Sequence, residues 1–195
     1  WPWRCCRDGS RGNKDRVISK AIDNRFGCAL ALDVIEHFNA VDLDVNLVVG
    51  ATVQEEVGLR GAKTATNLFK PDMFIALDAS PVNDLVDNDT TKLGEGFLLR
   101  IYDPRNTMHQ GLMNYFKKII SDNNLKHQPF ISMGGTDAAM ALDQQSGVLA
   151  TTIGLPARYI HSSAAMMDIK DVNEARKMVY LILEKTNASE IEKIK

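Results

Sequence analysis

The sequence lacks the features that mark secreted and membrane proteins. Its 195 residues include only three cysteines, an odd number without the spacing of a disulfide framework or a Cys-His zinc site, so structural disulfides are not expected. No apolar run approaches the roughly 18 residues that span a bilayer, and no segment resembles a signal peptide. We therefore expect a cytoplasmic protein that has no membrane partner.

An excess of charge of one sign is also lacking. The 23 Lys and Arg residues nearly balance the 25 Asp and Glu residues. No basic stripe interleaved with aromatic residues is present, which argues against a nucleic-acid partner. Small molecules or peptides are the ligands that this composition favours.

The first sixteen residues differ from the rest of the chain. Residues 1–16 carry both tryptophans and two of the three cysteines, and they show no hydrophobic periodicity. We expect this stretch to lie outside the fold. Residues 17–195 are expected to form one domain, because a chain of this size buries roughly 70% of its unfolded surface.

From Val17 onward, short apolar runs alternate with stretches of helical periodicity. The predicted extended segments are Ser19–Ile22, Asp44–Thr52, Met73–Leu77, Phe97–Tyr102, Phe130–Met133, Val148–Ile153 and Arg158–Ile160. The predicted helices are Phe26–Phe38, Gly61–Leu68, Gln110–Asn123, Thr136–Asp143 and Asp171–Thr186, with Thr136 and Asp171 as caps. This alternation indicates an α/β fold with a mostly parallel or mixed sheet covered by helices on both faces.

Two adjacent carboxylates, Glu55 and Glu56, follow the apolar segment Asp44–Thr52. Ligands in α/β sheets bind at the C-terminal ends of buried strands. Adjacent carboxylates repel each other, so the pair needs a compensating cation or a retained proton. A metal ligand beside a general base satisfies both conditions.

Three further residues follow predicted strands: Asp23, Asp78 and His161. A parallel topology would gather them with Glu55 and Glu56 at one edge of the sheet. Carboxylate and imidazole ligands suit zinc, cobalt or manganese, and a carboxylate-rich site tends to hold two ions. The sequence therefore predicts two divalent metal ions, with zinc or cobalt preferred and manganese as the alternative.

Five motifs resemble, in the same order, those of the M42 metallopeptidase family, and within it those of the bacterial glutamyl aminopeptidases. The motifs are AIDNRFG at Ala21–Gly27, QEEVGLRG at Gln54–Gly61, ALDASP at Ala76–Pro81, GGTDA at Gly134–Ala138 and ARYIHS at Ala157–Ser162. The resemblance covers roughly Val17–Thr186 and implies a zinc-exopeptidase-like (phosphorylase/hydrolase-like) catalytic domain. It implies an aminopeptidase that releases N-terminal residues from peptides.

The resemblance also implies a role for each site residue. Asp23 would bridge two metal ions, Glu56 and His161 would complete the protein ligands of one ion, and Asp78 would bind the other. Glu55 would be the general base that takes a proton from the attacking water. These roles agree with the division of the adjacent glutamates into a ligand and a base.

One part of the family pattern is missing. In the family, the ion held by the Asp78-type residue also takes a histidine from an upstream HxD motif, and a small dimerisation domain is inserted into the catalytic domain. The sequence contains neither, so we expect an N-terminally truncated catalytic domain. The resemblance further implies that complete relatives form homo-oligomers, from dimers to hollow dodecamers.

Four residues are candidates for substrate binding. A preference for N-terminal Glu or Asp requires a cationic pocket, and Arg100 and Arg158 are placed to supply it. The resemblance makes Gly135 and Asp137 a wall of the active site. Alternatively, either arginine pairs with a structural carboxylate, and the Gly134–Asp137 segment is a plain turn and helix cap.

Each predicted site residue also has a structural alternative. Asp23 could be a helix cap, Glu55 and Glu56 a solvated loop, Asp78 the start of a turn, and His161 a packed or surface histidine. Two other functions also remain open. The chain could be an inactive fragment that keeps the fold and part of the metal binding, or a metal-dependent deacylase of a non-peptide amide.

Overall fold

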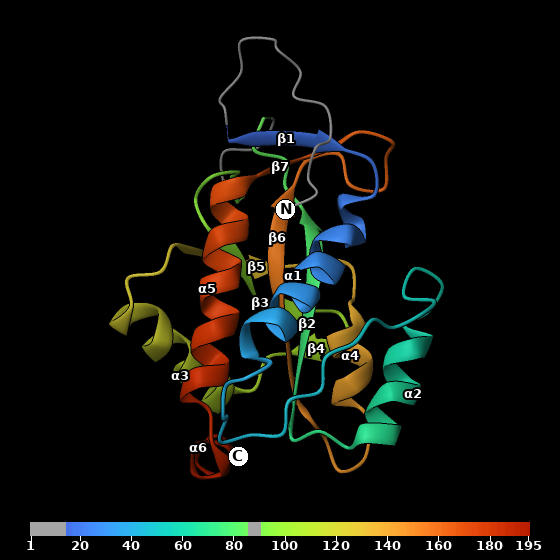
Figure 1. The fold of residues 1–195 in the computed structure, drawn as a ribbon. Coiled ribbons are helices and arrows are strands. Elements are labelled where there is room, and N and C mark those ends of the chain that lie inside the picture. The colour runs from blue at the N-terminus through green and yellow to red at the C-terminus, as the bar shows by residue number, and fades with distance from the viewer. Residues whose placement is uncertain (1–14, 86–90) are drawn as a thin grey trace.

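The computed structural model describes residues 15–85 and 91–195, so the prediction for residues 1–16 falls almost wholly outside the described part. Its centre is a five-stranded sheet in which β2, β6 and β3 are successive neighbours, and β3 also pairs with β4 and β5 (Figure 1). The strands are β2 Met73–Pro81, β3 Phe97–Asp103, β4 Asn106–Thr107, β5 His127–Ile131 and β6 Leu149–Ala157. Every residue of β6 is buried, as its apolar sequence LATTIGLPA requires of a central strand.

The sheet is mixed. β2 pairs with β6 in parallel from Met73↔Leu149 to Pro81↔Ala157, and β3 pairs with β5 in parallel. β3 runs antiparallel to both β6 and β4. The predicted mixed α/β sheet is thus confirmed.

Helices cover both faces of this sheet, and the alternation of side chains along each strand assigns them. Odd-numbered residues of β2 and β6, such as Leu77 and Ile153, belong to the main core, which also contains residues of α1, α3 and α5. Even-numbered residues, such as Ala76 and Ala150, pack against α4 on the opposite face, and α2 packs against α4. The helices are α1 Ile22–Phe38, α2 Arg60–Phe69, α3 Gln110–Asp122, α4 Asp137–Leu142, α5 Ile169–Lys185 and α6 Ala188–Ile194.

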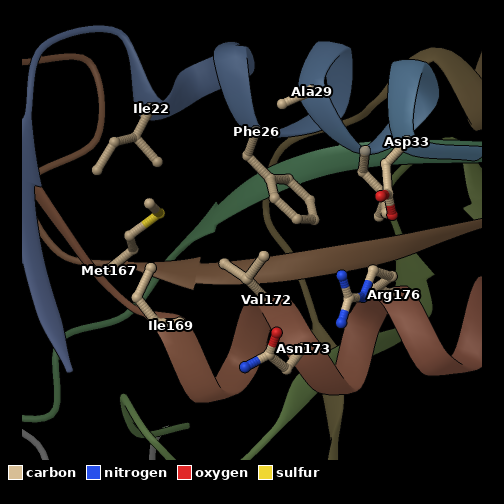
Figure 2. Close-up of a pocket in the computed structure, with 10 residues that line it drawn as sticks. Ile22, Phe26, Ala29, Asp33, Met167, Ile169, Val172, Asn173 and Arg176 are labelled. Carbon is tan, nitrogen blue, oxygen red and sulfur yellow. The ribbon is translucent and has the colours of Figure 1, made fainter. Parts of the chain in front are cut away.

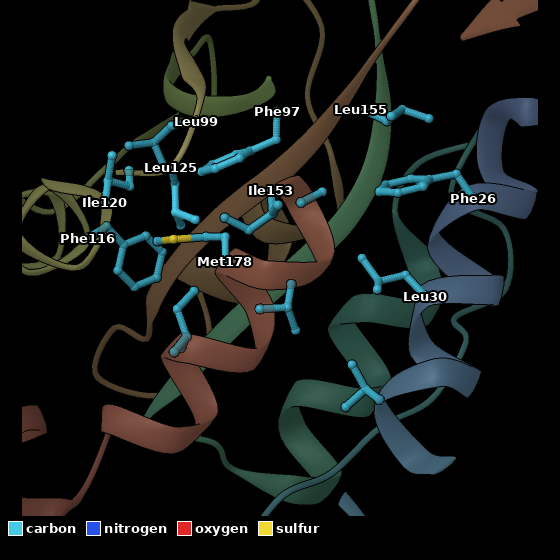
Figure 3. Packing of buried hydrophobic residues seen from close by; sticks show 14 of the residues in the cluster. Phe26, Leu30, Phe97, Leu99, Phe116, Ile120, Leu125, Ile153, Leu155 and Met178 are labelled. Atoms are coloured by element: carbon cyan, nitrogen blue, oxygen red, sulfur yellow. The ribbon is translucent and has the colours of Figure 1, made fainter. Parts of the chain in front are cut away.

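The main core joins the long helices to the sheet. Figure 3 shows Phe26 of α1, Phe116 of α3 and Met178 of α5 directed toward the strands around Ile153. Phe116, Ile153 and Met178 are fully buried. None of the described helices is long and apolar enough to cross a membrane.

A separate two-stranded ribbon lies beyond the main sheet (Figure 1). It pairs β1, Arg16–Ser19, with β7, Ala165–Asp168, in antiparallel fashion. The chain passes from β1 into α1 and from β7 into α5. The ribbon therefore ties the starts of these two helices together.

Four local predictions are wrong. Ser19–Ile22 is extended only at Ser19, where β1 ends, and Ile22 is the first residue of α1. Asp44–Thr52 is not a strand: none of the described strands pairs with it, and Leu47 and Val48 are exposed. Arg158–Ile160 contributes only an isolated bridge between Arg158 and Met166. Asp171 lies inside α5, whose cap is Asp168, with its side chain accepting a hydrogen bond from the Lys170 amide.

Candidate metal centre

Asp23 lies where α1 meets β2. Asp23 and Asn24 have non-helical backbone angles, and the peptide bond between them is cis. Asn24 accepts a hydrogen bond from the Gly27 amide and donates one to the Leu77 carbonyl at 2.7 Å. The alternative prediction was that Asp23 caps the helix. Asn24 makes this capping contact, and the carboxylate of Asp23 faces His161.

Glu55 and Glu56 lie in a tight turn that leads into α2. The Leu59 amide donates to the Glu55 carbonyl at 2.9 Å, and the Gly61 amide donates to the Val53 carbonyl at 2.9 Å. A Cβ atom on Gly61 would lie 2.4 Å from the Val53 nitrogen, so the turn requires glycine there. The glutamates are held by a hydrogen-bonded turn and not, as predicted, by the end of a strand.

His161 completes a three-residue cluster with Asp23 and Glu56. The His161 Nε2 atom lies 3.0 Å from Asp23 Oδ2 and 3.7 Å from Glu56 Oε2. One potential ligand atom from each residue lies within 4.8 Å of the others. His161 has a left-handed φ of 61°, a backbone conformation that often marks functional positions. The structure thus brings together three of the four predicted metal ligands.

Asp78, the fourth predicted ligand, is buried beside this cluster. It lies within β2, three residues before its end, and its carboxylate accepts a hydrogen bond from the Ala79 amide at 2.9 Å. Burial, followed by the charges of Asp23 and Glu55, raises the pKa of Asp78 to about 8. The pKa of Asp23 is also raised, first by burial and then by Glu56. These carboxylates therefore repel one another in a poorly solvated place.

Glu55 also lies close to several negatively charged carboxylates. Its pKa is raised to about 7, mainly by burial and then by the charges of Asp137, Glu56 and Asp23, while Arg100 acts in the opposite direction. A carboxylate that takes up a proton near neutral pH is suited to general base and acid chemistry. Among the predicted site residues, Glu55 therefore has the electrostatics of a base.

The two predicted substrate arginines have different surroundings. Arg100 is buried, donates to the Gly134 carbonyl at 2.8 Å and to Ser80 Oγ at 2.9 Å, and its charge acts on Asp78 and Glu55. Arg158 donates to both carboxylate oxygens of Asp84, at 2.6 and 2.9 Å. Arg100 Nη1 also lies 3.5 Å from Oδ2 of the buried Asp103, so both arginines pair with a structural carboxylate, although the charge of Arg100 also acts on the carboxylates of the candidate centre.

Asp137 and Gly135 follow β5 in the loop and helix that face Glu55. Asp137 is buried at the start of α4, and Thr52 Oγ1 donates a hydrogen bond to its Oδ2. The other Asp137 oxygen is buried without a hydrogen-bond partner among the described residues. Gly135 is exposed, and a Cβ atom there would make only ordinary contacts with Leu59 and Ala139. Thr52 is a part of this arrangement that sequence reasoning missed, because no local pattern links it to Asp137.

Comparisons with known proteins identify the family of the chain. The family model for M42 glutamyl aminopeptidase matches residues 7–178. The chain belongs to this family. Among curated M42 relatives, the glutamyl aminopeptidase of Lactococcus lactis subsp. cremoris (strain MG1363) is 42% identical over 183 residues, which cover 94% of this chain and 52% of the relative.

Solved aminopeptidase structures share the fold. The TET aminopeptidase of the marine sediment archaeon Thaumarchaeota archaeon SCGC AB-539-E09 superposes with a TM-score of 0.88 at 28% identity, covering 92% of this chain and 52% of that one. The TET1 peptidase of Pyrococcus horikoshii, which can assemble into a tetrahedron or a large octahedral shell, gives a TM-score of 0.81 at 26% identity, covering 89% and 52%. This M42 chain therefore spans about half the length of the relatives it matches.

The residues present fit the divalent metal ions that the M42 family implies. The cluster of Asp23, Glu56 and His161 offers carboxylate and imidazole atoms, which zinc, cobalt and manganese accept. The raised pKa values of Asp23 and Asp78 also favour a metal site here, because a bound cation would offset the repulsion between the carboxylates and favour their ionised forms. The geometry and the electrostatics thus agree on where the ions would be held.

Proposed function

We propose that this chain carries the catalytic portion of a metal-dependent aminopeptidase that hydrolyses N-terminal residues from peptides. The observation that carries the proposal is the convergence of Asp23, Glu56 and His161, with ligand atoms within 4.8 Å of one another, beside the buried Asp78. Asp23, Glu56 and His161 would hold one ion, and Asp23 and Asp78 would hold a second. Zinc or cobalt is proposed, with manganese as the alternative.

The protein residues divide the chemistry among them. When bound, the ions would lower the pKa of a water molecule and polarise the carbonyl of the scissile peptide bond. Glu55 takes the proton from the attacking water and passes it to the leaving amine. In the metal-free chain, burial and the neighbouring carboxylates raise the pKa of Glu55 to about 7, and bound cations would favour its ionised form, which is the form that accepts a proton.

A preference for N-terminal Glu or Asp is proposed to depend on Arg100. Its charge acts on Glu55 and Asp78, so it lies within the field of the centre. Its terminal nitrogens donate to Ser80 and Gly134, and one of them lies 3.5 Å from Asp103, so Arg100 would attract an acidic substrate through its charge and without direct contact. Arg100→Ala should weaken cleavage of Glu substrates more than Leu substrates, and equal losses would refute this part. Arg158→Ala is the matched control.

The proposal is tested by metal content and peptide cleavage measured on the same preparations. After dialysis against zinc or cobalt, the chain should retain about two ions, and Asp23→Asn should lose both. His161→Ala should lose metal, whereas His109→Ala, at another exposed histidine, should not. Glu55→Gln should keep its metal and lose roughly 10²–10⁴-fold in the rate of cleavage.

Three results would contradict the proposal. Equal metal content in the wild type and Asp23→Asn would remove the metal centre. Metal binding without cleavage of any N-terminal amino-acid amide or peptide would leave a metal-binding module in place of an enzyme. Cleavage of non-peptide amides alone would identify a deacylase, which uses the same residues.

A further inference from the structure

A cavity lies between α1 and α5, away from the candidate metal centre, and none of the predicted site residues lines it. Its volume is about 280 Å³. This is just below the roughly 300–1,000 Å³ of pockets for drug-sized ligands, so the cavity suits a smaller molecule. Figure 2 shows Ile22 and Met167 at one end of it, with Phe26 and Val172 on opposite sides of its middle.

The other end of the cavity is charged. Asp33 of α1 and Arg176 of α5 face each other there across the gap between the helices (Figure 2). They form no ion pair within 4.0 Å, and the Arg176 guanidinium has no hydrogen-bond or ion-pair partner among the described residues. Asp33 is buried, and its Oδ2 accepts a hydrogen bond from the Tyr180 hydroxyl at 2.7 Å. An anionic and a cationic group are thus held apart at one end of an apolar cavity.

We propose that this cavity binds a free amino acid with an apolar side chain, such as leucine or methionine. The α-carboxylate would pair with Arg176, and the α-ammonium group with Asp33. The side chain would fill the space between Phe26, Met167 and Val172. A zwitterion matches both charges at once, which matters because an unpaired charge is costly to bury.

Other small ligands match the cavity less well. A fatty acid would satisfy Arg176 but would place its carboxylate beside that of Asp33, where like charges repel. An apolar molecule without charges would leave the guanidinium without a partner. A short polar amino acid would leave the apolar end empty and forgo the hydrophobic contribution of burial.

The proposal is tested by calorimetric titration of the full chain with L-leucine and L-methionine. Both should bind saturably. Leucinamide lacks the carboxylate and N-acetyl-leucine lacks the ammonium group, so each should bind at least about tenfold more weakly, and glycine should not bind; these ligands are titrated into Asp23→Asn, in which the proposed peptidase cannot hydrolyse leucinamide to leucine. Asp23→Asn should bind leucine like the wild type, which separates this cavity from the metal centre and from the fate of the proposed peptidase activity.

Variants in the cavity give the second arm of the test. Arg176→Met and Asp33→Asn should each weaken leucine binding at least about tenfold. Ala29→Phe should abolish it by filling the space. Lys177→Met is the matched control, since Lys177 is exposed and pairs with Glu174. Circular dichroism would check the folding of each variant.

Two outcomes would overturn the proposal. The first is the absence of saturable binding by leucine and methionine. The second is binding that folded Arg176→Met and Ala29→Phe leave unchanged. The comparison of leucine with leucinamide and N-acetyl-leucine needs no substitution in the cavity, so the proposal can be refuted even if a cavity variant does not fold.

Discussion

Gly27 in α1 lies directly against the backbone carbonyl of Leu77 in β2: a Cβ atom at Gly27 would lie 2.1 Å from that oxygen. Real side chains do not tolerate such a contact, so only glycine allows the helix to approach the strand this closely. The approach places Asp23, four residues before Gly27, next to Asp78, one residue after Leu77. The absence of a side chain at Gly27 is therefore a condition for the metal centre.

Gly27→Ala should accordingly push α1 away from β2. We expect the free energy of unfolding to fall by roughly 1–3 kcal/mol, as for other overpacked sites. Metal affinity should fall roughly 10–100-fold, since the partners that orient metal ligands contribute this much. Gly50→Ala is the control, because nothing lies within 4 Å of a Cβ atom there. Chemical unfolding and metal titration of both variants would test this, and unchanged metal affinity in Gly27→Ala would count against it.

The carboxylates of the centre should make the stability of the metal-free chain fall as the pH rises. The pKa values of Glu55 and Asp78 are raised to about 7 and about 8, so the folded chain keeps protons that the unfolded chain has already released. Between about pH 4, where these carboxyls ionise in the unfolded chain, and about pH 8, their contribution to stability is therefore lost progressively as the pH increases.

Metal should remove or reverse this slope, because bound cations favour the ionised carboxylates of the folded chain. Urea unfolding at three pH values, with and without zinc, would measure the effect. Asp78→Asn should flatten the slope of the metal-free chain. A slope that is the same in the wild type and in Asp78→Asn would show that the burial of Asp78 is not its cause.

The ion pair between Arg158 and Asp84 should contribute to stability. The guanidinium binds both carboxylate oxygens, and only 17% of the Arg158 side chain and 7% of the Asp84 side chain are exposed. Either Arg158→Met or Asp84→Asn should lower the free energy of unfolding by roughly 1–3 kcal/mol. The double variant should lose less than the sum of the two single losses. Additive losses in this double-mutant cycle would mean that the pair contributes little.

The motif residues of the metal centre could be predicted from sequence, but the reason for their convergence could not. Asp23, Glu56 and His161 were expected together because parallel strands end at one edge. Instead, Asp23 follows a strand of the separate β1–β7 ribbon, and Glu56 lies in a turn. Their proximity depends on contacts between distant residues, such as Asn24 with Leu77.

The same limit explains the wrong strand at Asp44–Thr52. Its Val and Leu residues are typical of a buried strand, but a strand also needs a hydrogen-bonded neighbour, and none of the described strands provides one. For Arg100, in contrast, the predicted strand is correct and only its side-chain partners could not be predicted. Its position on a strand was predicted, whereas its bonds to Ser80 and Gly134 join segments that no local pattern connects.

Asp171 should be one of the most sensitive structural positions. It is fully buried in α5, where its two carboxylate oxygens accept hydrogen bonds from the amides of Gly94 and Gly96 at 2.8 and 2.7 Å. Asp171→Ala would leave both amides without a partner, so we expect the free energy of unfolding to fall by roughly 2–4 kcal/mol. Asp122→Asn, an exposed substitution at the end of α3, should change it by less than about 0.5 kcal/mol.

The pH dependence distinguishes the charge of Asp171 from its hydrogen bonds. Burial raises its pKa to about 6 from an ordinary value of 3.8, despite the two amide hydrogen bonds that lower it. As the pH rises from about 4 to about 6, the unfolded chain releases this proton first, so the contribution of Asp171 to stability falls over that window and changes little above it. Asp171→Asn keeps one acceptor and cannot titrate, so it should lose less stability than Asp171→Ala, and its stability should fall less steeply than that of the wild type between pH 4 and pH 6. If Asp171→Asn retained the full slope between pH 4 and pH 6 in urea unfolding, another buried carboxylate would have to be its source.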